Sequence, residues 1–171
     1  MVRHTRPFVC GSVLLGLVFA MLSAAVSDLT TYKIRNNLVL ALLLAYLVFA
    51  PVVGISSHEI IRSVAVAGVV LLVSFALFAA GLIGGGDAKL AAATALWFGF
   101  DHLLDYMIYA SLLGGALTLL ILQFRKLPLP TFLARQQWIT RLHETGGGVP
   151  YGIALAAAAL LIYPKTGWMP S

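Results

Sequence analysis

The sequence predicts an all-α membrane protein, a bundle of about six transmembrane helices with one interfacial segment. Of its 171 residues, 61% are apolar and only 10% are charged, against roughly 45–50% and about 25% in an average soluble domain. The mean hydropathy is +0.98, and a soluble fold of this length and composition would have too little polar surface to show to water. The apolar excess therefore faces lipid, and the long apolar runs favour helices.

The helices follow from the positions of these runs, since a bilayer core takes roughly 20 apolar residues as helix. The six candidates are 7–27, 37–57, 63–86, 88–100, 103–124 and 146–163. The run at 88–100 would be only about 20 Å long at 1.5 Å per residue. It spans a bilayer by continuing through Asp101 and His102 or by starting below the membrane surface.

The one long link, 125–145, carries two prolines and four basic residues. It also contains an amphipathic set suited to lying along lipid headgroups, made of Phe132, Leu133, Trp138, Ile139 and Leu142. We expect an interfacial segment here, so that residues 1–171 form a single transmembrane domain.

The distribution of Lys and Arg predicts the orientation, because such residues are enriched in cytoplasmic loops. One side of the membrane would hold seven, namely Lys33, Arg35, Lys89, Arg125, Lys126, Arg135 and Arg141; the other would hold four, namely Arg3, Arg6, Arg62 and Lys165. The first side is therefore predicted to be cytoplasmic. The same pattern explains the net charge of +5 without a nucleic-acid partner.

The first 27 residues also allow a second interpretation. A basic start, an apolar core and small residues near the end are typical of a secretory signal. The apolar stretch is longer than the usual signal core, and a retained helix would place Asp28 at a membrane boundary.

Two of the six acidic residues, Asp28 and Asp87, directly follow the first and third predicted helices. Because both helices run inward, the two carboxylates are expected at the same membrane face. Such a pair suits a catalytic dyad, in which one carboxylate draws a proton from water and the other, protonated, polarises the scissile carbonyl. The glycines before Asp87 would let a substrate strand or a helix approach closely.

Other interpretations remain open. The two aspartates are also compatible with helix caps and topology markers, with a proton- or cation-coupled transporter that uses both carboxylates, or with a non-catalytic assembly subunit. Asp101, His102 and Asp105 form a cluster that would suit a metal site or a second acid pair, although they are expected at the opposite face. The single cysteine, Cys10, excludes a disulfide framework or a Cys-rich zinc site within one chain.

The residues resemble the GxGD aspartyl proteases of membranes, and among them the type IV prepilin peptidases. The match consists of Gly84, Gly86 and Asp87 followed by Lys89, with Asp28 placed ahead of "IRN", where that family usually reads Ile-Pro-Asn. The late "GGGVPYGIAL" and the six-helix layout extend the resemblance over nearly the whole chain.

The resemblance implies an inner-membrane aspartic endopeptidase that removes the basic leader of type IV or Flp prepilins or pseudopilins at the cytoplasmic face. Asp28 and Asp87 would be catalytic, supported by Gly84, Gly86, Lys89 and Asn36, without a metal or another cofactor. Arg35 replaces the usual proline, while Asn36 can still cap the second helix. The chain lacks the paired-cysteine insertion of bifunctional members, so it looks like the short, peptidase-only type associated with tight-adherence (Flp) pili, without methyltransferase activity.

Overall fold

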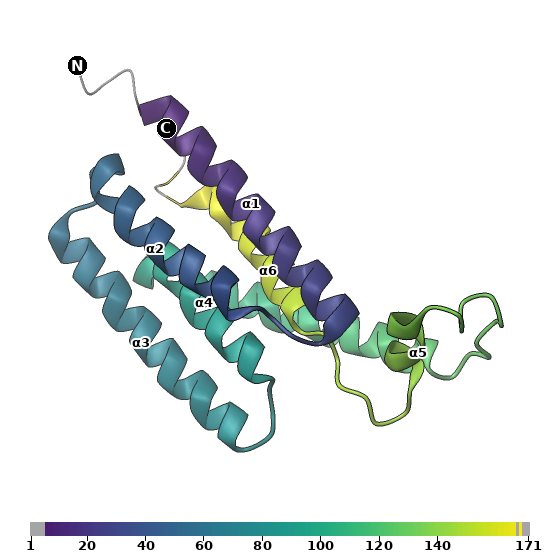
Figure 1. The fold of residues 1–171 in the computed structure, drawn as a ribbon. Coiled ribbons are helices and arrows are strands. Elements are labelled where there is room, and N and C mark those ends of the chain that lie inside the picture. Colours follow the sequence, from purple (N-terminus) through teal and green to yellow (C-terminus); the bar gives the residue numbers. More distant parts are fainter. Residues whose placement is uncertain (1–5, 167, 169–171) are drawn as a thin grey trace.

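The computed structural model describes residues 6–166 and 168, and over these residues the elements are all helical, as Figure 1 shows. They are α1 (Arg6–Thr31), α2 (Asn36–Val53), α3 (Ser57–Ala79), α4 (Gly85–Phe124), α5 (Gln137–His143) and α6 (Gly152–Ile162), followed by a 3-10 turn, η1 (Tyr163–Lys165). The predicted all-α membrane fold is confirmed. Arg3, one of the basic residues used to predict the orientation, lies outside the described residues.

Four helices, α1 to α4, are long and apolar enough to cross a membrane, and α6 is a shorter apolar helix. With 40 residues, α4 would be about 60 Å long if straight, which is twice the roughly 30 Å of a hydrocarbon core. It is interrupted at Gly99, whose φ of 60° and ψ of −163° are not helical. The chain therefore turns between 85–98 and 100–124, close to the junction that the sequence predicts near Asp101.

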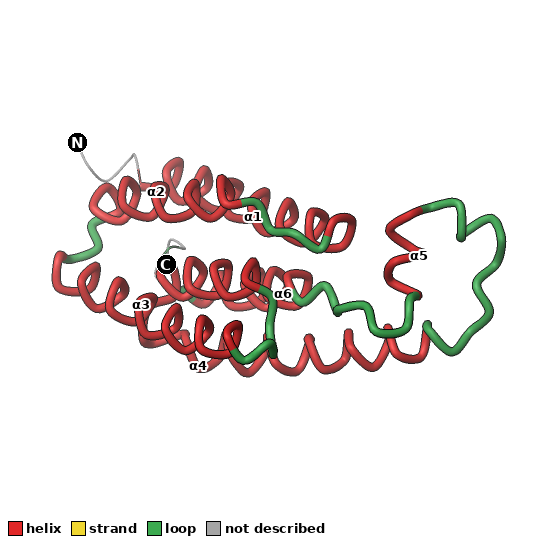
Figure 2. The backbone as a smooth tube through the Cα atoms, turned by 60° about the horizontal axis from the view of Figure 1, so that its bottom comes forward, coloured by secondary structure: helices red, strands yellow, loops and turns green. Residues whose placement is uncertain are grey.

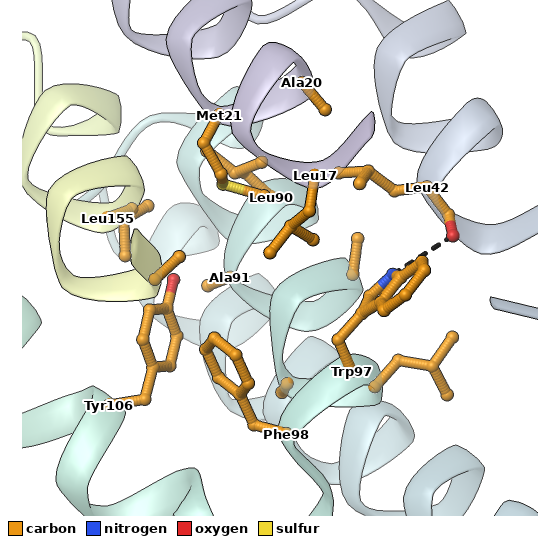
Figure 3. Packing of buried hydrophobic residues seen from close by; sticks show 14 of the residues in the cluster. Leu17, Ala20, Met21, Leu42, Leu90, Ala91, Trp97, Phe98, Tyr106 and Leu155 are labelled. Carbon is orange, nitrogen blue, oxygen red and sulfur yellow. Dashed lines mark hydrogen bonds between the residues drawn. The ribbon is translucent and has the colours of Figure 1, made fainter. Parts of the chain in front are cut away.

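The half-helix 85–98 forms the centre of the bundle. Every residue from Leu90 to Phe98 is buried, because α4 packs against α2, α3 and α6, while α6 also packs against α1. Figure 3 shows Leu90 and Ala91 among side chains of the surrounding helices. Alanines predominate in this half-helix and in α6, and small residues let membrane helices approach closely.

Aromatic side chains close the end of the bundle near Gly99. Trp97 donates its indole N–H to the Leu42 carbonyl at 3.2 Å, drawn as the dashed line in Figure 3, and Trp168 donates to the Trp97 carbonyl at 2.9 Å. The two indole rings lie 4.7 Å apart, and Tyr46 meets both rings edge-on. Each buried indole thus has a hydrogen-bond partner, as burial of this group requires.

Several helix boundaries differ from the predicted ones, for local reasons. α2 ends at Val53 rather than 57 because Gly54 adopts a left-handed φ of 90°, a common way to end a helix. α3 starts at Ser57 rather than 63 because Ser56 and Glu59 form a capping box. His58 and Glu59, which lie between the second and third predicted helices, therefore belong to α3.

Two further boundaries matter for the site. α3 ends at Ala79 rather than 86, and Gly81, with a φ of 73°, lies in the turn to α4. α6 begins at Gly152 rather than 146, so an extended stretch lies between α5 and α6. Figure 2 shows that stretch and the longer loop after α4 projecting beyond the bundle with α5.

Candidate active site

Asp28 lies inside α1 rather than after it, because that helix continues to Thr31. Its side chain is only 5% exposed. The carboxylate oxygen Oδ2 accepts a 2.7 Å hydrogen bond from the backbone N–H of Gly152, the first residue of α6. A buried carboxylate is thereby tied to the start of a helix, where the unpaired N–H groups and the helix dipole favour an anion.

Asp87 lies in the first turn of α4, not at the end of the third helix as predicted. Its carboxylate oxygen Oδ2 lies close to Gly84, the N-cap residue, since a Cβ on Gly84 would lie 2.8 Å from it. Its other oxygen, Oδ1, is buried and has no hydrogen-bond partner among the described residues. Asp87 therefore retains a free acceptor inside the protein.

The two aspartates line one cavity of about 650 Å³. The remaining wall comes from the turn before α4, from the second half of α4 and from the segment that enters α6. These lining residues are Tyr32, Gly81, Leu82, Ile83, Gly84, Thr118, Gly148, Val149 and Tyr151. Desolvation and mutual repulsion oppose ionisation of both carboxylates at once, which leaves one able to hold a proton.

Gly84 and Gly86 lie in tightly packed surroundings. A Cβ on Gly84 would lie 2.8 Å from Oδ2 of Asp87, and a Cβ on Gly86 would lie 3.2 Å from Cβ of Ile34. Both distances, one to an oxygen and one to a carbon, are shorter than ordinary van der Waals contacts. Gly84 also lines the cavity, whereas Gly86 packs beside it.

Asn36 and Lys89 bind each other instead of lining the cavity. The Lys89 Nζ donates a 3.1 Å hydrogen bond to Oδ1 of Asn36, which ties the start of α4 to the start of α2. The prediction that Asn36 caps α2 is wrong, because the N-cap residue is Arg35 and no side-chain capping bond forms there. Arg35 has a φ of −69° and a ψ of 132°, which are angles that proline also adopts.

Two tyrosines of the cavity wall, Tyr32 and Tyr151, were not singled out from the sequence. Tyr32 has a left-handed φ of 54°, which is uncommon for a bulky residue. Burial raises the pKa of the Tyr32 phenol above its usual value, and the nearby Arg125 charge opposes this shift. The phenol is therefore protonated at neutral pH. The placement of Tyr32 one helical turn after Asp28 was the available sequence signal.

Tyr151 fixes the start of α6 against the second half of α4. Its hydroxyl donates to the Ala110 carbonyl at 3.3 Å, and its ring lies so close to Gly114 that no side chain would fit there. Burial raises the pKa of the Tyr151 phenol, and the Asp87 charge adds to this effect. This phenol also remains protonated at neutral pH.

Comparison with known families identifies the protein class. A model of the type IV leader peptidase family matches residues 15–119, which is more than half of the chain and includes Asp28 and Asp87. The chain belongs to this family. The resemblance to prepilin peptidases is thereby confirmed, and the protein is a membrane protease of the prepilin leader-peptidase kind. Searches of curated proteins and of solved structures gave no match.

Arg125, the residue directly after α4, binds the part of the chain that leads from α5 to α6 in this leader peptidase. Its guanidinium donates to the backbone carbonyls of Leu142, Gly147 and Gly148 at 2.9, 2.9 and 3.0 Å. A second tie comes from His143, whose Nε2 lies 2.8 Å from the Leu127 carbonyl. Since Gly148 lines the cavity, Arg125 fixes part of the cavity wall.

The cluster of Asp101, His102 and Asp105 is not part of this site. Asp101 and His102 line a separate cavity of about 200 Å³ beside Gly99, at the other end of the bundle. Within residues 6–166 and 168, no three His, Cys, Asp or Glu side chains are grouped as metal ligands would be. The acid pair that shares the large cavity is therefore the candidate for the chemistry of the leader peptidase.

Proposed function

We propose that this leader peptidase is an aspartic endopeptidase in which Asp28 and Asp87 form the catalytic pair. The observation that carries the proposal is that both carboxylates line one cavity, although they come from different helices. Family membership favours proteolysis over the transporter hypothesis, which would use the same two carboxylates.

The proposed reaction needs one ionised and one protonated carboxyl group. The ionised group removes a proton from water as the water oxygen adds to the peptide carbonyl carbon, while the protonated group donates to the carbonyl oxygen. Collapse of the tetrahedral intermediate breaks the C–N bond, and a carboxyl proton passes to the leaving amine. The cavity of about 650 Å³ leaves room for a peptide segment and for water beside both carboxylates.

The proposed substrate is a type IV or Flp prepilin, or a pseudopilin, with a short basic leader ahead of an apolar helix. The apolar helix would lie in the bilayer beside the enzyme, and the leader would reach the carboxylates at the cytoplasmic face of the bacterial inner membrane. Negative charge at the site would favour a basic leader. The support for this orientation is the larger number of Lys and Arg residues predicted on that side.

The supporting residues act by packing rather than by chemistry in this proposal. Gly84 and Gly86 leave room for the Asp87 side chain and for Ile34, and Lys89 with Asn36 holds two helix starts together.

No methyltransferase activity is proposed, because the chain has one cysteine and lacks the paired-cysteine insertion. Mass spectrometry of the cleaved product, after incubation with a methyl donor, should find a free N-terminal amine.

The central experiment compares single variants of the reconstituted protein acting on a Flp-type prepilin, with leader removal followed on a gel. Asp28→Asn and Asp87→Asn should each lower the cleavage rate by roughly 10³-fold or more, as loss of a catalytic group does. Asp105→Asn is the matched control, because Asp105 is exposed and does not line the cavity. Normal cleavage by either dyad variant would refute the assignment.

A further inference from the structure

Ile34 lies between the two helix starts that form the site. It belongs to the connector between α1 and α2, and its side chain is buried. A Cβ on Gly86 would lie 3.2 Å from Cβ of Ile34, and a Cβ on Gly152 would lie 3.0 Å from its Cδ1. Ile34 is therefore packed between the first turn of α4 and the first residue of α6.

Each of these two glycines is directly linked to one carboxylate. Gly86 precedes Asp87 in the chain, and the backbone N–H of Gly152 donates to Asp28 at 2.7 Å. A Cβ on Gly152 would also lie 2.8 Å from the accepting Oδ2 of Asp28. Any change in the separation of the two glycines would consequently move Asp87 relative to the donor that orients Asp28.

The shape of isoleucine suits a spacer at this point. A β-branched side chain has few rotamers and therefore keeps a fixed width. Its neighbours on the two sides are Gly86 and Gly152, which have no side chains. The Ile34 side chain therefore packs directly against the backbone of α4 and of α6. Such a contact holds the two helix starts at a nearly fixed distance, since packed protein interiors deform very little.

We propose that Ile34 is a positioning residue of the active site, which sets the spacing between the α4 end carrying Asp87 and the α6 end that holds Asp28. This proposal rests on the proposed role of the two carboxylates. It extends that role to a residue without chemistry of its own, and it explains why glycine stands at both 86 and 152. Because a displacement of about 1 Å can cost a factor of about 10² in rate, the spacing affects turnover more than substrate binding.

The experiment compares Ile34→Ala with Ile162→Ala in the prepilin cleavage assay, measuring kcat, KM and the thermal midpoint of each variant. Ile162 is fully buried at the other end of α6, so both variants lose the same atoms from the interior. Ile34→Ala should lower kcat roughly 10- to 100-fold with KM changed by less than about twofold. Ile162→Ala should lower the thermal midpoint by at least as much while kcat of the folded enzyme stays near the wild-type value.

Two further variants test the spacing itself. Ile34→Val keeps the branched Cβ beside Gly86 but lacks the Cδ1 that lies beside Gly152, so its kcat should fall between those of Ile34→Ala and the wild type. Gly152→Ala should lower kcat because its methyl group would contact both Ile34 and Asp28, whereas Gly115→Ala, with open space around that position, should not.

Equal losses of kcat in Ile34→Ala and Ile162→Ala, or an unchanged kcat in Ile34→Ala, would overturn the proposal. Asp28→Asn is assayed in parallel to distinguish a failure of the positioning role from a failure of the catalytic pair. If Asp28→Asn is inactive and Ile34→Ala is normal, the positioning role fails alone. If Asp28→Asn is active, the proposed catalytic pair itself fails.

Discussion

Arg35 replaces the proline that prepilin peptidases usually have before the second helix, yet the backbone at this residue follows a path that proline also adopts. Its φ of −69° and ψ of 132° are those of an extended N-cap residue, and the proline ring fixes φ near −65°. The geometry is therefore produced without the ring, by the packing of neighbouring Ile34 and the tie between Asn36 and Lys89.

Arg35→Pro should accordingly be tolerated. Proline at a position that already has compatible angles stabilises a protein by about 0.4–1 kcal/mol, because it restricts the unfolded chain. We expect a small rise in thermal midpoint in detergent and a cleavage rate within about twofold of wild type. A clear loss of stability would show that the Arg35 side chain or its backbone N–H makes an essential contact.

At the residue scale, the sequence predicts the two acids and the need for glycine, but not how the acids are held. Asp28 is oriented by Gly152, which lies far along the chain and acts through its backbone amide. A backbone donor leaves no mark on residue type, so no inspection of side chains would identify it. The contact of Ile34 with Gly86 and Gly152 escapes sequence analysis for the same reason.

At the scale of elements, the break in α4 is the feature that makes the bundle possible. Gly99 has a φ of 60° and a ψ of −163°, a combination open almost only to glycine. It reverses the chain so that 85–98 becomes the core and 100–124 returns toward the end where Asp87 lies. Without this turn, Thr118 of the returning helix would not line the same cavity as Asp87.

Gly99→Ala should therefore destabilise the fold by about 1–3 kcal/mol, the usual cost of a strained backbone conformation. The thermal midpoint in detergent, followed by circular dichroism, measures this loss. Gly68→Ala is the matched control, because Gly68 is helical and a Cβ there would meet open space. Equal midpoints for the two variants would contradict the structural role given to Gly99.

Helix existence was predictable because apolar runs of bilayer length are unambiguous, while helix ends depend on short-range capping. The left-handed Gly54 ends α2, and the capping box of Ser56 and Glu59 starts α3, each several residues before the predicted boundary. The central half-helix 85–98 is short for a span, and it is accommodated because protein rather than lipid surrounds it. Length alone does not reveal that enclosure.

At the scale of the whole molecule, the bundle has two distinct ends. At one end, near the C-terminus of α1, Asp28 and Asp87 line the large cavity. At the other end, Asp101 and His102 line the small cavity beside Gly99. The predicted orientation assigns the first end to the cytoplasm because more basic residues are expected there.

Single-cysteine variants in a Cys10→Ser background test this orientation. Lys126→Cys should react with a membrane-impermeant maleimide only after cells are permeabilised, because position 126 belongs to the predicted cytoplasmic side. His58→Cys, exposed at the other end of the bundle, should react in intact cells. The reverse pattern would invert the orientation, and labelling of both from one side would refute the alternation of helices.

The hydrogen bonds from the Arg125 guanidinium to backbone carbonyls have a consequence for protein engineering. The guanidinium donates to the carbonyl oxygens of Leu142, Gly147 and Gly148. These are backbone atoms, so the anchor does not depend on the side chains of the segment between α5 and α6. Exposed side chains in the loop before α5, such as Thr131 and Phe132, can therefore be exchanged while the anchor stays in place. That loop offers a site for an epitope or a fluorescent reporter on a working enzyme.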